Sequence, residues 1–139
     1  MPDVGCEAEI VRGAFLSMSR AADGTPEESA ALTERWFHPE VEYVEDPSWP
    51  GSSTYRGREL VRDTFEGYRE VIGGSIAVEE VVEGDNGVFA RIRVSGESSG
   101  AHIPWDQSFG YLCRVRDGKL SYFRAYFDVD QAKRDAGIR

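Results

Sequence analysis

The stretch Tyr43-Val44-Glu45-Asp46-Pro47-Ser48-Trp49-Pro50-Gly51 ends an alternating apolar run at a carboxylate and then turns. Proline cannot donate a hydrogen bond to a sheet, and it favours an extended conformation in the residue before it. We therefore expect a strand to end at Asp46 and the chain to leave the sheet at Pro47. The rest of the chain can be interpreted outward from this strand end.

Asp46 has two interpretations. The bulky residues that follow it could remove water from its carboxylate; they are Trp49, Pro50, Gly51 and Tyr55. Loss of water raises the pKa of a carboxylate toward the range that suits a general base. Alternatively, Asp46 is a solvated turn residue, because Asp-Pro pairs are common in turns. The first interpretation predicts a catalytic acid and the second a structural one.

The 139 residues carry a formal net charge of −9 and include two cysteines. This length predicts one domain, residues 1–139. The negative charge argues against nucleic acid and anionic membranes as partners, since both bind clustered Lys and Arg. Cys6 and Cys113 are far apart and form no CxxC motif. We expect both to be reduced thiols, with Cys113 buried in a strand.

The first residues show no basic patch followed by an apolar run, which a signal peptide would need. No apolar run approaches the ~20 residues that span a bilayer. We therefore expect a cytoplasmic protein. Neither histidine lies at ligand spacing from a Cys, Asp or Glu, so we predict no metal and no other cofactor.

Apolar residues recur at helical spacing in three segments, residues 7–22, 25–37 and 58–72. Thr25, Pro26 and Glu28 form a typical helix start. Besides the strand that ends at Asp46, alternation predicts four strands, at residues 76–82, 88–94, 107–116 and 120–128. We expect a short last helix at residues 131–136. This order indicates an α+β fold in which the helices cover one face of a curved sheet.

The same order resembles the nuclear transport factor 2-like superfamily, which includes ketosteroid isomerases and SnoaL-like polyketide cyclases. The local marks are Val44-Glu45-Asp46-Pro47, Arg56-Gly57-Arg58-Glu59, Arg114-Val115-Arg116-Asp117-Gly118-Lys119-Leu120 and Ala125-Tyr126-Phe127-Asp128. The resemblance covers nearly the whole chain. It implies a cone-shaped, curved mixed sheet covered by three helices, of the cystatin-like and ketosteroid-isomerase-like type. This scaffold hosts many unrelated functions, so the resemblance says less about activity.

In ketosteroid isomerases the Asp of a Glu-Asp-Pro stretch is the general base, so the resemblance implies this role for Asp46. At the positions of the isomerases' two tyrosines and their protonated aspartic acid, this chain has Phe15, Phe65 and Tyr111. An apolar ring cannot donate a hydrogen bond, which leaves Tyr111 as the donor for an enolate oxygen. The resemblance therefore implies a related proton transfer rather than steroid isomerisation itself.

Epoxide hydrolases of the limonene type use an Arg flanked by two Asp on this scaffold. One of those Asp lies on the last strand, where this chain has Ala125, so the water-activating arrangement is incomplete. Arg91 and Arg93 alternate with apolar residues. This spacing predicts that both lie on the outer or dimer face of the sheet.

We expect the partner to be a hydrophobic small molecule held between aromatic walls. On the last strand, Phe123 and Phe127 should point inward with Phe109 and Tyr111. The outer set, Tyr122, Arg124 and Tyr126, should pair two chains in a homodimer through the sheet. The expected substrate-binding residues are Phe15, Trp49, Tyr55, Phe65, Tyr68, Trp105, Phe109, Phe123 and Phe127.

Three further polar residues have competing interpretations. His102, in a Gly-rich loop near Trp105, could transfer protons because the pKa of a free histidine lies near neutrality, or it is a solvated surface residue. His38 precedes a proline, which suggests the C-terminal cap of a helix. Asp128 could be a second catalytic acid, but it is better explained as the N-cap of the last helix.

The sequence thus leaves three functions open. In the first, an isomerase, cyclase or dehydratase acts on a hydrophobic carbonyl compound, with Asp46 as the base and Tyr111 and His102 as further catalytic candidates. In the second, the same cavity binds a small apolar ligand without catalysis. In the third, the fold serves only dimerisation, and its aromatic side chains fill the interior.

Overall fold

The computed structural model describes residues 6–21, 25–72, 74–97 and 104–138, with the side chains of 19–21, 69–72, 74 and 104–105 excepted. The helices are α1 (Glu7–Ala21), α2 (Pro26–Trp36), α3 (Arg58–Ile72) and α4 (Val129–Ala136). The strands are β1 (Phe37–Val44), β2 (Thr54–Arg56), β3 (Gly74–Glu83), β4 (Val88–Glu97), β5 (Pro104–Arg116) and β6 (Lys119–Tyr126).

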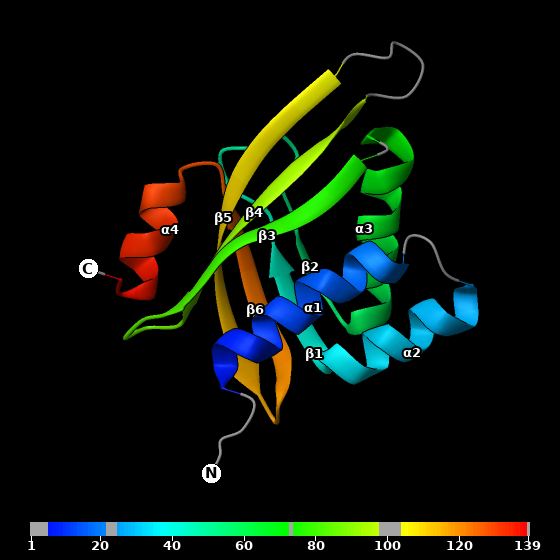
Figure 1. Ribbon diagram of the computed structural model, residues 1–139, viewed down its shortest axis with the longest axis horizontal. Helices are drawn as coiled ribbons and strands as arrows, with labels where there is room; N and C mark the ends of the chain where they lie inside the picture. The colour runs from blue at the N-terminus through cyan, green and yellow to red at the C-terminus, as the bar shows by residue number, and fades with distance from the viewer. Residues whose placement is uncertain (1–5, 22–24, 73, 98–103, 139) are drawn as a thin grey trace.

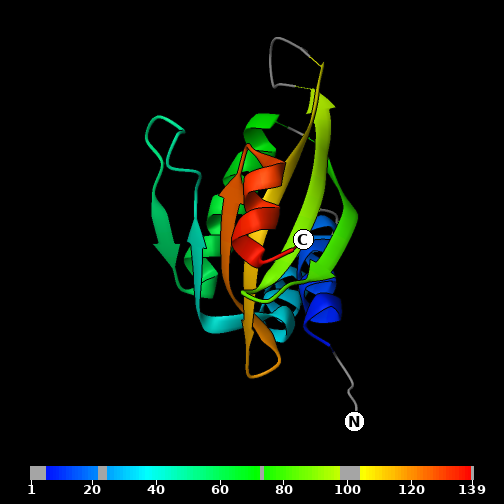
Figure 2. The same cartoon turned by 90° about the vertical axis from the view of Figure 1, so that its left-hand side faces the viewer.

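The strands form one mixed sheet in the order β2-β1-β6-β5-β4-β3. β1 runs parallel to β6, and the other neighbouring strands are antiparallel. The sheet is strongly curved, with α1, α2 and α3 on one side and α4 on the other (Figures 1 and 2). The predicted α+β fold, with three helices covering one face of a mixed sheet, is therefore confirmed.

The start of α2 follows the sequence prediction, whereas its end does not. The Thr25 hydroxyl accepts a hydrogen bond from the Glu28 N–H (3.2 Å), and Glu28 Oε1 accepts one from the Thr25 N–H (3.0 Å). β1 begins directly after α2, so His38 lies in a strand and the helix-cap interpretation is wrong. Its Nδ1 accepts a hydrogen bond from the backbone N–H of Glu40 at 3.0 Å.

The outer face of the sheet is partly covered by α4 (Figure 2). Phe89, Leu112 and Tyr126 pack there against two alanines of the helix, Ala132 and Ala136. The prediction that Tyr126 faces a partner chain is therefore wrong, because a helix of its own chain buries it. The homodimer itself stays a prediction.

The two arginines of β4 and the cap of α4 agree with the sequence analysis. Arg91 pairs with Glu80 (3.2 Å), which also approaches Lys133 of α4 (3.9 Å), so Arg91 lies on the outer face. Arg93 pairs with Asp106 on the neighbouring strand. Asp128 is the N-cap of α4 and accepts a hydrogen bond from the Gln131 N–H at 3.2 Å.

Gly110 of β5 lets α4 approach the sheet closely. A Cβ at this position would lie 2.7 Å from the Cβ of Ala132 and 3.1 Å from the Cα of Val129. We expect Gly110→Ala to lower the free energy of unfolding by about 1–3 kcal/mol, the usual cost of overpacking, as measured by urea denaturation.

The matched control is Gly67→Ala in α3, where an added Cβ would meet nothing within 4 Å. Alanine is the better helix former, so this variant should be stabilised by roughly 0.5–1 kcal/mol. Equal effects of the two substitutions would contradict the close contact between α4 and the sheet.

Two further sequence predictions can be compared with the structure. Cys113 is buried in β5 and Cys6 is exposed, and both are free thiols. Across the described segments, no helix combines the length and the apolar character needed to cross a bilayer.

Candidate functional site

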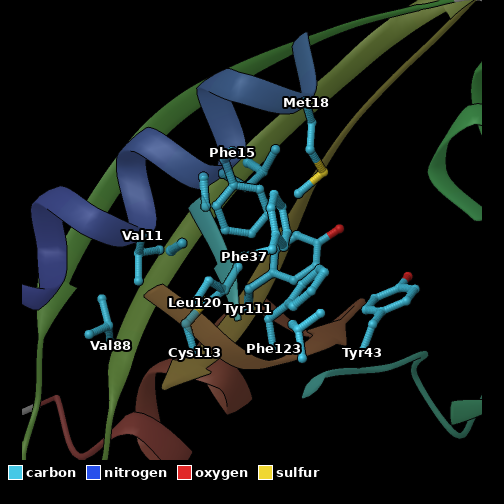
Figure 3. Close-up of a cluster of buried hydrophobic side chains, with 14 of the residues drawn as sticks. Val11, Phe15, Met18, Phe37, Tyr43, Val88, Tyr111, Cys113, Leu120 and Phe123 are labelled. Carbon is cyan, nitrogen blue, oxygen red and sulfur yellow. The ribbon is translucent and has the colours of Figure 1, made fainter. Parts of the chain in front are cut away.

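Aromatic rings fill the space between the sheet and the helices of its inner face (Figure 3). Phe123 of β6 is fully buried at their centre. The centroid of its ring lies 4.7–6.2 Å from those of five others, Phe15, Phe37, Tyr43, Phe65 and Tyr111. Phe15, Phe65 and Phe123, predicted as pocket walls, thus belong to one packed cluster.

Tyr111 is buried in this cluster, where burial and the nearby Tyr43 raise the pKa of its phenol well above the ordinary value. Its hydroxyl therefore stays protonated at neutral pH and can donate a hydrogen bond. The hydroxyls of Tyr111 and Tyr43 project from the same side of the cluster (Figure 3). Tyr43 is thus a second buried phenol on that side, and its hydroxyl lies 3.4 Å from that of Tyr68.

Glu45 follows directly after β1 and continues the inward-facing series of that strand. Side chains of a strand alternate between the two faces, and Val41, Tyr43 and Glu45 are all buried. Glu45 is 7% exposed, and within the described part of the chain no other carboxylate is buried. The acid that reaches the interior is therefore Glu45 and not its neighbour Asp46.

Three donors from the elements around Glu45 satisfy its carboxylate. Oε1 accepts hydrogen bonds from the Ser53 N–H (3.0 Å) and the Tyr55 hydroxyl (3.4 Å). Oε2 accepts one from the hydroxyl of Tyr68 on α3, which lies 3.4 Å from the Tyr43 hydroxyl. These bonds replace the water that the buried group has lost. The result is a connected chain of one carboxylate and three phenols.

The three phenols hydrogen-bonded in series with Glu45 all stay protonated. Burial raises the pKa of Tyr68 and of Tyr55, and the charge of Glu45 raises both further. Burial also raises the pKa of Tyr43, with Tyr68 next to it as the second cause. At neutral pH the group thus combines a proton acceptor with hydroxyl donors, the components needed for general acid–base chemistry.

Asp46 points to the opposite side of β1 and is fully engaged. Its Oδ1 accepts hydrogen bonds from the N–H and the hydroxyl of Ser48, both at 2.8 Å, and its Oδ2 accepts one from the N–H of Phe127 at 2.8 Å. Partial burial pushes its pKa up, but these bonds and the charge of Arg124 outweigh that effect. The pKa of Asp46 is lowered, so the predicted rise is wrong. Its role as a base stays a prediction.

Three other residues predicted to bind substrate form a third group, which we call the aromatic lip: Trp49, Phe109 and Phe127. The ring of Phe127 lies 5.6 Å from that of Trp49 and 5.5 Å from that of Phe109. Trp49 is 43% exposed and Phe127 39% exposed. Phe127 follows the last residue of β6 and is exposed, so the prediction that its side chain points inward with that of Phe123 is wrong. Trp49 contacts Phe127 and does not seal Asp46 from water.

The sequence analysis did not include Glu45 and Tyr43 among its candidate residues, whereas it did include Tyr55 and Tyr68. The alternation of side chains along a strand could have identified them, because Tyr43 and Glu45 are two residues apart and therefore share a face. His102 and the side chain of Trp105 lie outside the described residues. In the part of the chain that is described, no three His, Cys, Asp or Glu side chains gather as a metal site would require.

Comparisons with known proteins agree with this geometry. The family model of the SnoaL-like domain matches residues 21–123. A comparison with curated proteins gave no match. A proposed SnoaL-like polyketide cyclase from Jannaschia sp. CCS1 has 16% identity and a TM-score of 0.70, over 94% of this chain and 91% of that one.

Two other solved structures have the same fold. A proposed isomerase from Bacillus subtilis has 19% identity and a TM-score of 0.68, over 99% of this chain and all of that one. A hypothetical protein from Catenulispora acidiphila DSM 44928, with a ketosteroid isomerase-like fold and in complex with trimethylamine, has 19% identity and a TM-score of 0.67. That match covers 94% of each chain. These likenesses confirm the fold that the sequence resembled, and identities this low say nothing of activity.

Proposed function

Because the chain belongs to the SnoaL-like domain family, we propose that it is an enzyme that moves a proton within a hydrophobic carbonyl compound. The reaction would be an isomerisation, a cyclisation or a dehydration. The observation that carries this proposal is a buried carboxylate, Glu45, in hydrogen-bond contact with the phenols of Tyr55 and Tyr68.

Glu45 takes the role of the base in this scheme. Its carboxylate accepts the proton from the carbon next to the carbonyl, and the electrons of that C–H bond move onto the carbonyl oxygen. Tyr111, with Tyr43 on the same side of the cluster, supplies a hydroxyl to the resulting enolate. The proton returns to another carbon in an isomerisation. In a cyclisation the enolate carbon attacks a second carbonyl, whose oxygen then takes the proton from Glu45. In a dehydration the enolate expels hydroxide from the neighbouring carbon, and the hydroxide leaves as water with that proton.

The proposal is tested by hydrogen exchange, which does not require the natural substrate. The protein is incubated in D₂O with a panel of apolar ketones that includes 2-tetralone. Deuterium at the carbon next to the carbonyl is measured by NMR. We expect exchange faster than in buffer for at least one ketone; exchange at the buffer rate across the panel would contradict the proposal.

A second candidate function, binding without catalysis, is favoured by the charge of Glu45. Within the segments that the structure describes, Glu45 forms no ion pair with Lys, Arg or His. The hydroxyls of Tyr55 and Tyr68 contact its carboxylate, and Phe65 packs against Tyr68, so aromatic rings lie close to Glu45. The faces of such rings attract organic cations. The Catenulispora protein of the same fold is in complex with trimethylamine, an amine that is cationic when protonated. An organic ammonium ion would fit this chemistry.

The matched probes for this candidate are choline and 3,3-dimethylbutan-1-ol, which has the same shape but no charge. If the site binds cations, choline should bind at least about 10-fold more tightly in calorimetric titration, since a desolvated cation–π contact contributes about 2 kcal/mol. Glu45→Gln should remove most of that preference. Equal affinity of the wild-type protein for the two probes would exclude a cation site.

A further inference from the structure

We infer that Asp46 is a positioning residue: its carboxylate fastens the loop of residues 47–53 to the end of β6 and thereby holds the aromatic lip in place. The lip would contact the apolar part of the ligand, and only this part of the inference rests on the proposed function. Asp46 and Glu45 are neighbours on opposite faces of the chain. Their roles therefore differ: Glu45 faces the interior, whereas Asp46 holds the loop that carries Trp49.

The hydrogen bonds of Asp46 connect two segments that the sheet does not connect. The parallel pairing of β1 with β6 ends at Val44 and Arg124. Beyond it, Asp46 Oδ2 accepts the N–H of Phe127, which takes the place of a further backbone bond. The loop after Asp46 and the end of β6 lie at the same end of the sheet (Figure 1). Asp46 thus acts as a side-chain extension of the sheet at this end.

The other oxygen of Asp46 shapes the loop itself. Oδ1 accepts two bonds from Ser48, and the backbone carbonyl of Asp46 accepts the N–H of Trp49 at 2.9 Å. The far end of the loop returns to Glu45 through paired bonds with Ser53, both at 3.0 Å. Both ends of the loop that carries Trp49 are therefore fixed, one by Asp46 and the other by Glu45.

The lip has the composition of a ligand contact. The centroids of its two exposed rings, Trp49 and Phe127, lie 5.6 Å apart at the surface, where a ligand can contact both. Phe109 links them to the inner cluster, against which it packs. The lip is thus continuous with the aromatic interior, and the ligand it fits is a flat apolar ring system.

The substitution Asp46→Asn separates the two roles of the carboxylate. Its one amide oxygen can keep the bonds from Ser48, but its NH₂ group would then face the N–H of Phe127, and two donors cannot bond. Asp46→Asn should therefore release β6 while it preserves the turn. The matched control is Asp128→Asn, on the other side of Phe127, because Asn caps helices as well as Asp does.

The test uses the full chain labelled with 5-fluorotryptophan and observed by ¹⁹F NMR, with the Trp49 resonance assigned by Trp49→Phe. In Asp46→Asn we expect this resonance to move toward that of free 5-fluorotryptophan, while the resonance of Trp36 stays in place. Asp128→Asn should move neither of the two. An unchanged Trp49 resonance in Asp46→Asn would overturn the inference.

Exchange kinetics separate this inference from the proposed function. For 2-tetralone we expect Asp46→Asn to raise KM by roughly 2- to 10-fold, the effect of one lost hydrogen bond, with kcat changed less. Loss of kcat with an unmoved Trp49 would make Asp46 the base and overturn the inference. Full turnover by Glu45→Gln, together with a released Trp49 in Asp46→Asn, would refute the proposed base and support the positioning role.

Discussion

Glu45→Gln is expected to lower the rate of proton exchange by about 10²–10⁴-fold, the usual contribution of a positioned general base. Glutamine has nearly the same shape as glutamate but cannot accept the proton. Its amide oxygen can still accept hydrogen bonds from the Ser53 N–H and the Tyr55 hydroxyl, as Oε1 does now. The Tyr68 hydroxyl can rotate to accept a bond from the amide nitrogen. The fold should therefore survive while the base is lost.

The measurement is the initial rate of deuterium incorporation, compared between Glu45→Gln and the wild-type protein at saturating ketone. Asp46→Asn is the matched variant, because it makes the same chemical change at the next residue on the opposite face. Equal melting temperatures of the three proteins would show that the rates are comparable. Wild-type exchange by Glu45→Gln would remove Glu45 from the mechanism.

The comparison of these two acids shows what the sequence could and could not predict. The motif Glu45-Asp46-Pro47 placed an acid at the end of a strand, and the structure agrees. Which acid faces inward depends on the phase of the alternation, and a family motif carries no information on that phase. Counting in steps of two from Tyr43 selects Glu45, because a one-residue shift moves a side chain to the other face.

Other differences arose where tertiary contacts override local patterns. β2 has only three residues, too few for a periodic signal, and it forms because Tyr55 pairs with Tyr43 across the turn. The alternation of β6 places Tyr126 on the outer face, as observed, but no local pattern indicates that α4 covers that face. The long periodic elements, α3 above all, were predicted almost to the residue, since their apolar stripes alone determine them.

Phe123→Ala is expected to lower the free energy of unfolding by about 3–5 kcal/mol, the range for removal of a buried phenylalanine ring. Phe123 is fully buried at the centre of the aromatic cluster, so its loss removes contacts with helices and strands at once. The rings around Phe123 come from different helices and strands and cannot all move inward together. The cavity left by the removed ring would therefore persist. Urea denaturation with linear extrapolation measures the change.

Phe127→Ala is the control for the free-energy loss expected of Phe123→Ala. It removes the same ring four residues later, from a side chain that is 39% exposed and contacts only Trp49 and Phe109 among the described aromatic rings. We expect a loss of about 1 kcal/mol or less, since surface substitutions rarely exceed that value. Similar losses for the two variants would contradict the division of the aromatic residues into a packed interior and an exposed lip. A large difference, with binding of flat ligands lost only in Phe127→Ala, would assign stability to the first ring and recognition to the second.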